Sequence, residues 1–206
     1  MSRSLGHQNI WCWGVEMMMC DRGIQPKYYQ RVAKLRHHRS LHRYEYCQYY
    51  SWAIPSNKAI EAIAKYAPIV EIGAAGGYWA SLIVDHTSDP NSVKCFDTKE
   101  WGSDQEFHDY RPAKQWHPCD RGDHRVLKEY PDHNLFLCWP PMSQMAAECL
   151  THFKGMYLIY VGESDGGCTA DKAFFRLLKR KYREIDHVPL LQWSGINDRL
   201  WIYQRK

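Results

Sequence analysis

The sequence lacks several features that mark specialised classes of protein. None of its apolar runs approaches the roughly 18 to 20 residues that a membrane-spanning helix requires. Its eight cysteines include no Cys-x-x-Cys pair, and several fall in apolar stretches, so we expect buried free thiols. Neither an internal repeat nor a low-complexity tract is present. The 206 residues, 45% hydrophobic and 24% charged, indicate an ordinary globular protein that can bury a substantial core.

Two further absences concern location and metals. Residues 1–20 contain no clear small-residue cleavage site, and Glu16 interrupts their apolar stretch, so we expect no secretory signal, no membrane association and a cytoplasmic protein. The eleven histidines include His37, His38 and His42, but no cysteine or carboxylate set at zinc spacing accompanies them. We therefore expect a solvated helix face there and no metal site.

The most informative segment is residues 68–80, Pro-Ile-Val-Glu-Ile-Gly-Ala-Ala-Gly-Gly-Tyr-Trp-Ala, followed twenty residues after Gly77 by Asp97 at the end of a second apolar run. This pattern predicts a strand, a glycine-rich turn, a helix and a second strand that ends in a carboxylate. Glycines in such a turn let the backbone approach a ligand closely. Asp97 would then accept hydrogen bonds from ribose hydroxyls, so the segment indicates a nucleotide-cofactor pocket.

The turn does not have the fingerprint of a dinucleotide site. That fingerprint, G-x-G-x-x-G, requires glycines at positions 73, 75 and 78, and this chain has Ala75 and Tyr78. Glu71, two residues before Gly73, would repel a pyrophosphate and suits a cationic ligand instead. An NAD-dependent oxidoreductase is therefore disfavoured.

The turn resembles motif I of the class I S-adenosylmethionine-dependent methyltransferases, E/D-x-G-x-G-x-G. Glu71, Gly73 and Gly77 match it, and Ala75 stands in place of the middle glycine. The resemblance implies that Glu71 holds the ribose side or the amino-acid end of S-adenosylmethionine, and that the loop from Gly73 through Ala74 to Gly77 lines its methionine moiety. The extra methyl group of Ala75 is tolerable unless the backbone there needs a positive φ, which alanine disfavours.

Two acidic residues complete the cofactor site that the resemblance implies. Asp97 would bind the ribose, and Asp123, which follows Gly122, would contact the adenine amino group. The alternative for Asp123 is an ordinary loop aspartate. The mixed segment before it, residues 116–119, is a candidate for the third strand.

Residues 134–142, Asn-Leu-Phe-Leu-Cys-Trp-Pro-Pro-Met, predict a buried central strand that the two prolines end. Their last four residues resemble motif IV of the amino-methyltransferases, Asp/Asn/Ser-Pro-Pro-Tyr/Phe/Trp. In that family the first residue accepts a hydrogen bond from the substrate amine and the last stacks on the base. Here these positions hold Trp139, which only donates, and Met142, so the usual arrangement for methylating a base amine is disfavoured. Cys138 and Trp139 are expected to line the cofactor and catalytic cleft.

Residues 155–163 predict a second buried strand that ends in a carboxylate, Glu163. If the two strands are neighbours, Glu163 projects into the same cleft as Trp139. Burial beside aromatic rings would raise the pKa of Glu163 toward neutrality, which makes it the best candidate for a general base. The alternative is a carboxylate that braces a loop or caps a helix.

Residues 185–193 and 199–204 predict a C-terminal hairpin. An antiparallel last strand distinguishes class I methyltransferases from ordinary dinucleotide-binding folds.

Further segments resemble a methyltransferase-like family that carries Leu-Phe-Leu-Cys-Trp-Pro-Pro; they are residues 50–55, 71–74, 135–141, 162–169 and 192–200. The resemblance covers residues 50–206. It implies an α/β, Rossmann-like class I methyltransferase fold, whose seven-stranded sheet is mostly parallel with an antiparallel C-terminal strand.

Residues 1–49 are expected to form an N-terminal extension, partly helical and basic, before a methyltransferase-like domain at residues 50–206. Arginine, histidine and tyrosine are dense in residues 27–50, which would bind a phosphate backbone or, alternatively, pack as an amphipathic helix. Residues 55–66 predict a further helix. Trp52, just before it, is a candidate for a lid over the cofactor or for the core.

These observations predict a methyltransferase that uses S-adenosylmethionine and acts on a small-molecule or nucleic-acid substrate, between which the sequence does not decide. The alternative is a non-catalytic binding module with the same fold, which acts on a nucleic-acid or protein partner through the basic N-terminal arm. Ala75, Trp139 and Met142 favour that alternative, because each departs from the family pattern.

Overall fold

The computed structural model describes residues 42–98, 114–193 and 195–206. Arg43–Lys206 form one compact unit. Its helices and strands, in chain order, are α3 (His42–Tyr49), α4 (Asn57–Ala64), β1 (Ile69–Ile72), α5 (Tyr78–Thr87), β2 (Val93–Asp97), β3 (Asp120–Arg121), the 3-10 helix η1 (His124–Glu129), β4 (Asn134–Cys138), α6 (Met145–His152), β5 (Tyr157–Gly162), α7 (Lys172–Lys181), β6 (Tyr182–Pro189) and β7 (Arg199–Arg205).

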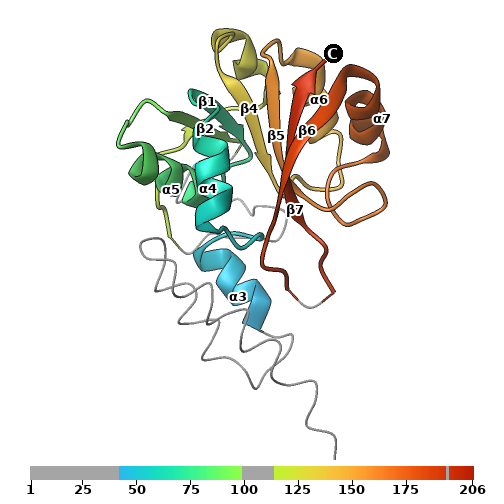
Figure 1. Cartoon of the computed structure of the whole chain (residues 1–206). Helices are drawn as coiled ribbons and strands as arrows, with labels where there is room; N and C mark the ends of the chain where they lie inside the picture. The colour runs from blue at the N-terminus through green and yellow to red at the C-terminus, as the bar shows by residue number, and fades with distance from the viewer. Residues whose placement is uncertain (1–41, 99–113, 194) are drawn as a thin grey trace, which may run out of the picture. The chain divides into compact units, whose positions relative to one another are not determined.

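The strands form one seven-stranded sheet in the order β3-β2-β1-β4-β5-β7-β6 (Figure 1). The pairs from β3 to β5 are parallel, and β7 runs antiparallel to both of its neighbours. The predicted α/β fold with a mostly parallel sheet and an antiparallel C-terminal strand is therefore confirmed, and it is consistent with the Rossmann-like methyltransferase fold that the sequence resembles. In such a sheet ligands bind at the carboxyl ends of the parallel strands.

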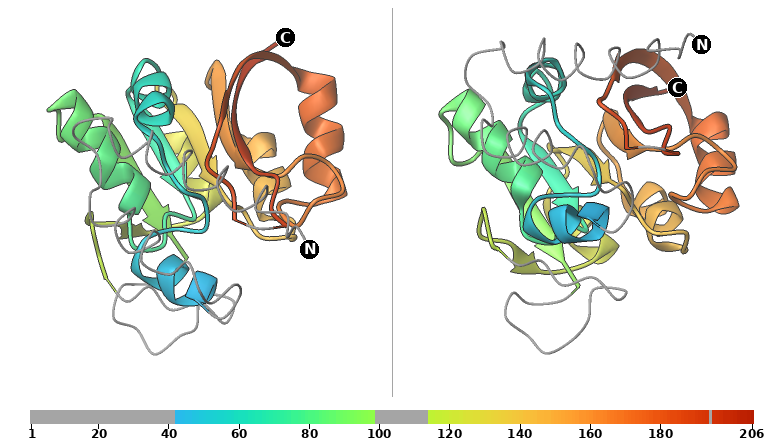
Figure 2. Two further views of the ribbon diagram at one scale, coloured as in Figure 1. Left: turned by 60° about the horizontal axis from the view of Figure 1, so that its bottom comes forward. Right: turned by 90° about the horizontal axis from the view of Figure 1, so that it is seen from below.

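Helices cover both faces of the sheet (Figure 2). On one face α4 packs against α5, and on the other α6 packs against α7 and η1. Successive side chains of a strand point to opposite faces of the sheet. Val70 and Ile72 of β1 pack in the hydrophobic core with residues of α6 and α7, whereas Glu71 faces the side that α5 covers. This alternation matters for the site, because it places a carboxylate among apolar neighbours.

Three local expectations differ from the structure. The third strand is Asp120–Arg121, just after the segment expected to form it, and β6 begins at Tyr182 rather than at residue 185. The helix expected over residues 55–66 is the shorter α4, because Ser56 caps it by accepting a hydrogen bond from the Ala59 N–H.

Within the described ranges, no helix is long and apolar enough to cross a membrane. The same residues contain no group of three or more metal-ligating side chains.

Candidate cofactor and acceptor site

The turn between β1 and α5 has the conformation that its glycines allow. Gly73 and Gly77 have φ values of 80° and 70°, and Gly77 is the residue before the first turn of α5. The Gly73 and Ala74 N–H groups both donate to the Phe96 carbonyl, at 2.8 and 3.1 Å. Ala75 also has a positive φ, of 48°. The backbone at Ala75 therefore needs the conformation that alanine disfavours, at a cost of about 1 to 2 kcal/mol.

Asp97 ends β2 directly beside this turn. It is 9% exposed, and its Oδ2 accepts a hydrogen bond from the Ala75 N–H at 3.0 Å. This bond holds the strained residue in place and fixes the carboxylate relative to the loop. The structure thus brings together the loop and the acidic residue that the sequence singled out, and the contact of Asp97 with ribose stays a prediction.

Glu71 lies in the middle of the sheet, just before the turn. It pairs in register with Cys95 of β2 and Phe136 of β4 and is 2% exposed. Its Oε2 has no hydrogen-bond partner in residues 42–98, 114–193 and 195–206. Burial, followed by the nearby charge of Asp97, raises the pKa of Glu71 to about 8. A buried carboxyl oxygen without a partner is uncommon and indicates a place where a ligand or water completes the bonding.

Aromatic side chains lie against the glycine turn. The Trp116 N–H donates to the Gly76 carbonyl at 2.7 Å, and the Trp116 ring stacks on Tyr50, with centroids 5.4 Å apart. It also contacts Tyr78 at 4.9 Å. Sequence reasoning expected Trp116 in a strand and missed this role, since no local pattern links it to residues 38 or more positions away.

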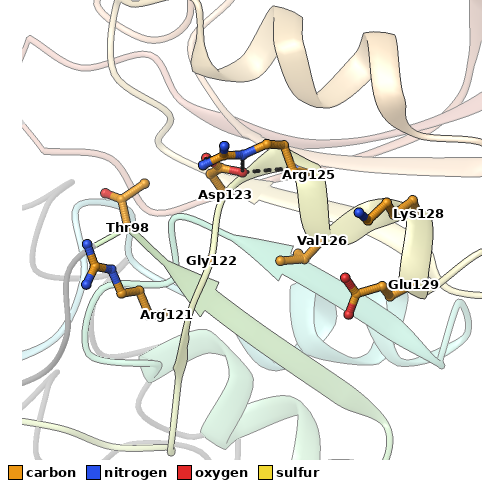
Figure 3. Close-up of a pocket in the computed structure, with 8 residues that line it drawn as sticks. All are labelled: Thr98, Arg121, Gly122, Asp123, Arg125, Val126, Lys128 and Glu129. Carbon is orange, nitrogen blue, oxygen red and sulfur yellow. Dashed lines mark hydrogen bonds and ion pairs between the residues drawn. The ribbon is translucent and has the colours of Figure 1, made fainter.

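Asp123 does what an ordinary loop aspartate does. It caps η1 by accepting from the Arg125 N–H at 2.9 Å, and its two oxygens pair with the Arg125 side chain at 2.7 to 3.0 Å (Figure 3). The hydrogen bond from Arg125 lowers the pKa of Asp123 to about 2. Asp123 also lines a pocket of about 440 Å³ beside Thr98 and Arg121. Its contact with adenine stays a prediction.

A second group of functional side chains lies where β4 ends. Trp139 has a φ of 52°, which is a strained conformation for a bulky aromatic residue. Its backbone N–H donates to the Val161 carbonyl at 2.7 Å, and its indole N–H donates to Asp198 Oδ2 at 2.8 Å. Its ring stacks on Trp52, with centroids 5.7 Å apart and planes at 18°. These contacts hold the tryptophan against the carboxyl edge of the sheet.

Asp198 was not among the residues that the sequence singled out. It is 0% exposed, and within the part of the chain that the structure describes its Oδ1 has no hydrogen-bond partner. Burial raises the pKa of Asp198 to about 6, and Glu163 adds to the rise, although the Trp139 hydrogen bond and Arg43 oppose it. Asp198 lies in the segment 192–200 that the family resemblance includes, but that resemblance assigns it no role.

Glu163 follows β5 and is 6% exposed. Its Oε2 accepts from the Cys168 N–H at 2.8 Å, and its Oε1 accepts from the Asn197 N–H at 2.7 Å. Burial by itself raises the pKa of Glu163, but the hydrogen bonds from Cys168 and Asn197 and the charge of Arg43 outweigh it and lower the pKa. The expected rise in this pKa is therefore wrong. The geometry is that of a carboxylate that braces two loops, and a catalytic role stays a prediction.

The remaining predicted residues lie in or next to these two groups. Cys138 is half-buried, and burial, followed by Glu71 and Asp198, raises its pKa well above the ordinary value, so it stays a thiol. Ala74 is buried in the turn. Residues 27–41, which make up most of the basic arm, lie outside the described residues. The same holds for His37 and His38 of the short histidine tract.

Comparison with known proteins gives likeness in structure only. No model of a known protein family matches the sequence, and no protein of curated function does. Similar solved structures include the pyocyanin biosynthetic protein PhzM, at 14% identity and a TM-score of 0.45 over 73% of this chain and 55% of that one, so this chain spans about half of its length. The magnesium protoporphyrin IX methyltransferase ChlM from Synechocystis PCC 6803, solved with bound SAM, is 9% identical, and its alignment has a TM-score of 0.47 and covers 100% of both chains. The tRNA methyltransferase TrmK of B. subtilis is 14% identical, with a TM-score of 0.44 over 71% of this chain and 65% of that one. Because these identities and TM-scores are low, we base the function on this chain's own residues.

Proposed function

We propose that the protein is an S-adenosylmethionine-dependent methyltransferase that binds its cofactor at the carboxyl ends of β1 and β2. The observation that carries the proposal is Glu71, which is 2% exposed and lies behind the glycine turn. One of its carboxyl oxygens has no hydrogen-bond partner among the residues that the structure describes. Asp97, 9% exposed, lies close enough to raise the pKa of Glu71. Two carboxyl groups behind one turn favour a ligand that carries positive charge, and they disfavour a pyrophosphate.

The residues present fit that cofactor. Glu71 would neutralise its cationic amino-acid and sulfonium end, the turn from Gly73 to Gly77 would let the backbone approach it, and Asp97 would accept from the ribose hydroxyls. Asp123 remains the candidate for the adenine side. The bound cofactor would supply an electrophilic methyl group.

The chain's own part in the reaction is placement. Trp139 and Trp52 form an aromatic wall at the end of β4, which would exclude water from the methyl acceptor. Held in line in such a pocket, a nucleophile gains most of its rate from orientation. Glu163 and Trp139 are the predicted catalytic residues, with Glu163 as the base and Trp139 as the wall against which the acceptor lies.

The proposal is tested by calorimetric titration of the full chain with S-adenosylmethionine, S-adenosylhomocysteine and NAD in parallel. We expect the first two to bind and NAD not to bind. Asp97 also braces Ala75, so the informative variant is Asp97→Asn, whose amide oxygen can still accept that bond. Loss of a charge-assisted bond to ribose should weaken binding about tenfold to 150-fold.

A matched control is Asp85→Ala, which removes an exposed carboxylate from α5 and should leave affinity unchanged. Binding of NAD alone would contradict the proposal, as would equal affinity of a folded Asp97→Asn variant. Binding without methyl transfer to any offered small molecule or RNA would favour the non-catalytic module.

A further inference from the structure

Four side chains from distant parts of the chain meet where β4 ends and β7 begins. Arg43 of α3 places its guanidinium carbon 4.9 Å from the ring centroid of Trp52 and 4.8 Å from that of Trp139. Asp198 joins them through its hydrogen bond from the Trp139 indole. We call Arg43, Trp52, Trp139 and Asp198 the Arg43 cluster.

Three polar atoms of the Arg43 cluster are buried without a hydrogen-bond partner among the described residues. They are Nε and Nη2 of Arg43 and Oδ1 of Asp198. Nε and Nη2 lie on one edge of the guanidinium, which is the two-donor edge that binds oxygen acceptors side-on. Buried donors and acceptors are nearly always paired, so one acceptor and one donor are missing from this place.

The charges around the Arg43 cluster limit what kind of ligand can supply the missing acceptor and donor. The site contains the charges of Arg43 and Asp198, and the carboxylate of Glu163 is close enough to interact with both. The charge of Arg43 lowers the pKa of Glu163, and the charge of Glu163 raises the pKa of Asp198. An anionic ligand would bring a third negative charge into a buried site. A cation would have no acceptor for the two Arg43 donors. A neutral group with a carbonyl oxygen and an adjacent N–H supplies the acceptor and the donor that the three atoms lack.

We propose that the Arg43 cluster is a binding subsite for a neutral planar group that presents a carbonyl oxygen beside an N–H, as a carboxamide or the lactam edge of a heterocycle does. The carbonyl oxygen accepts from Arg43 Nε and Nη2, and the N–H donates to Asp198 Oδ1. That this group belongs to the methyl acceptor rests on the proposed function, since the cluster lies at the end of β4. The binding chemistry itself does not depend on it.

Four small benzene derivatives test the subsite on the full chain, by ligand-observed NMR. Benzamide has both the carbonyl and the N–H, N,N-dimethylbenzamide lacks the N–H, benzoate is an anion, and benzamidinium is a cation without an acceptor. We expect benzamide to bind and each of the others to bind at least about tenfold more weakly, because each leaves a buried group unpaired. Tighter binding of benzoate or benzamidinium, or no binding of benzamide, would overturn the proposal.

Variants locate the binding. Arg43→Lys keeps the charge but loses the two-donor edge, and Asp198→Ala removes the acceptor, so both should lose benzamide. Arg199→Ala, next to Asp198 but exposed, should keep it. Circular dichroism shows whether the Asp198→Ala variant still folds. If that variant does not fold, the benzamide affinity of Arg43→Lys tests the subsite instead. Unchanged binding in a folded variant of either kind would refute the subsite.

The same samples separate this inference from the proposed function. Benzamide binding without any binding of S-adenosylmethionine would retain the subsite and refute the methyltransferase. Binding of S-adenosylmethionine without benzamide would do the reverse.

Discussion

Replacing Glu71 by Gln should change how the stability of the protein depends on pH. Folding raises the pKa of Glu71 from 4.5 to about 8. Below pH 4.5 the group is neutral in both states and costs nothing. Between pH 4.5 and 8 the unfolded chain ionises Glu71 while the folded protein keeps it protonated, so the free energy of unfolding falls by about 1.36 kcal/mol per pH unit. At pH 7 the accumulated loss is about 3 kcal/mol, and above pH 8 it is constant.

The amide that Glu71→Gln introduces cannot ionise, so the variant lacks this loss. Urea unfolding of both proteins from pH 5 to pH 9 measures the difference, which should widen in favour of the variant by about 1.36 kcal/mol per unit up to about pH 8. The absolute stability of the variant also includes its own buried amide, but that contribution does not change with pH. Parallel curves for the two proteins would refute the assignment of a neutral, buried carboxyl group behind the glycine turn.

Two further substitutions test the turn and the loop brace. Ala75→Gly should raise the free energy of unfolding by about 0.5 to 1 kcal/mol, because glycine relieves the positive φ, whereas Ala173→Gly inside α7 should lower it by about 1 kcal/mol. Glu163→Gln should lower it by about 1.5 to 3 kcal/mol, since one amide oxygen cannot replace a carboxylate that accepts from both Cys168 and Asn197. If Glu163→Gln instead leaves stability intact and loses about a hundredfold or more in turnover, Glu163 is a general base.

Local pattern was enough to predict the first strand, the glycine-rich turn, the helix after it and the second strand that ends in Asp97. Glu71, Gly73 and Gly77 lie within seven residues, and Asp97 ends the next strand, so the adjacency of β1 and β2 alone brings them together. The same local reasoning foresaw that Ala75 would be strained if its φ were positive.

Long-range contacts between side chains were beyond the sequence. Trp139 and Asp198 are 59 positions apart, and Arg43 comes from a helix outside the sheet. The pKa of Glu163 was predicted in the wrong direction for the same reason: burial was foreseen, but the N–H of Asn197, 34 residues away, was not. No period or spacing in one sequence encodes such pairs.

The central claim is that a cationic cofactor binds beside Glu71, and proton release measures it directly. With a pKa of about 8, Glu71 is mostly protonated at pH 7, and a bound positive charge would drive it to ionise. Titration with S-adenosylmethionine at pH 7, in two buffers of different ionisation enthalpy, should therefore show release of a proton from Glu71 as the cofactor binds, and none from Glu71→Gln. Binding with no proton release, or equal release from both proteins, would contradict the account.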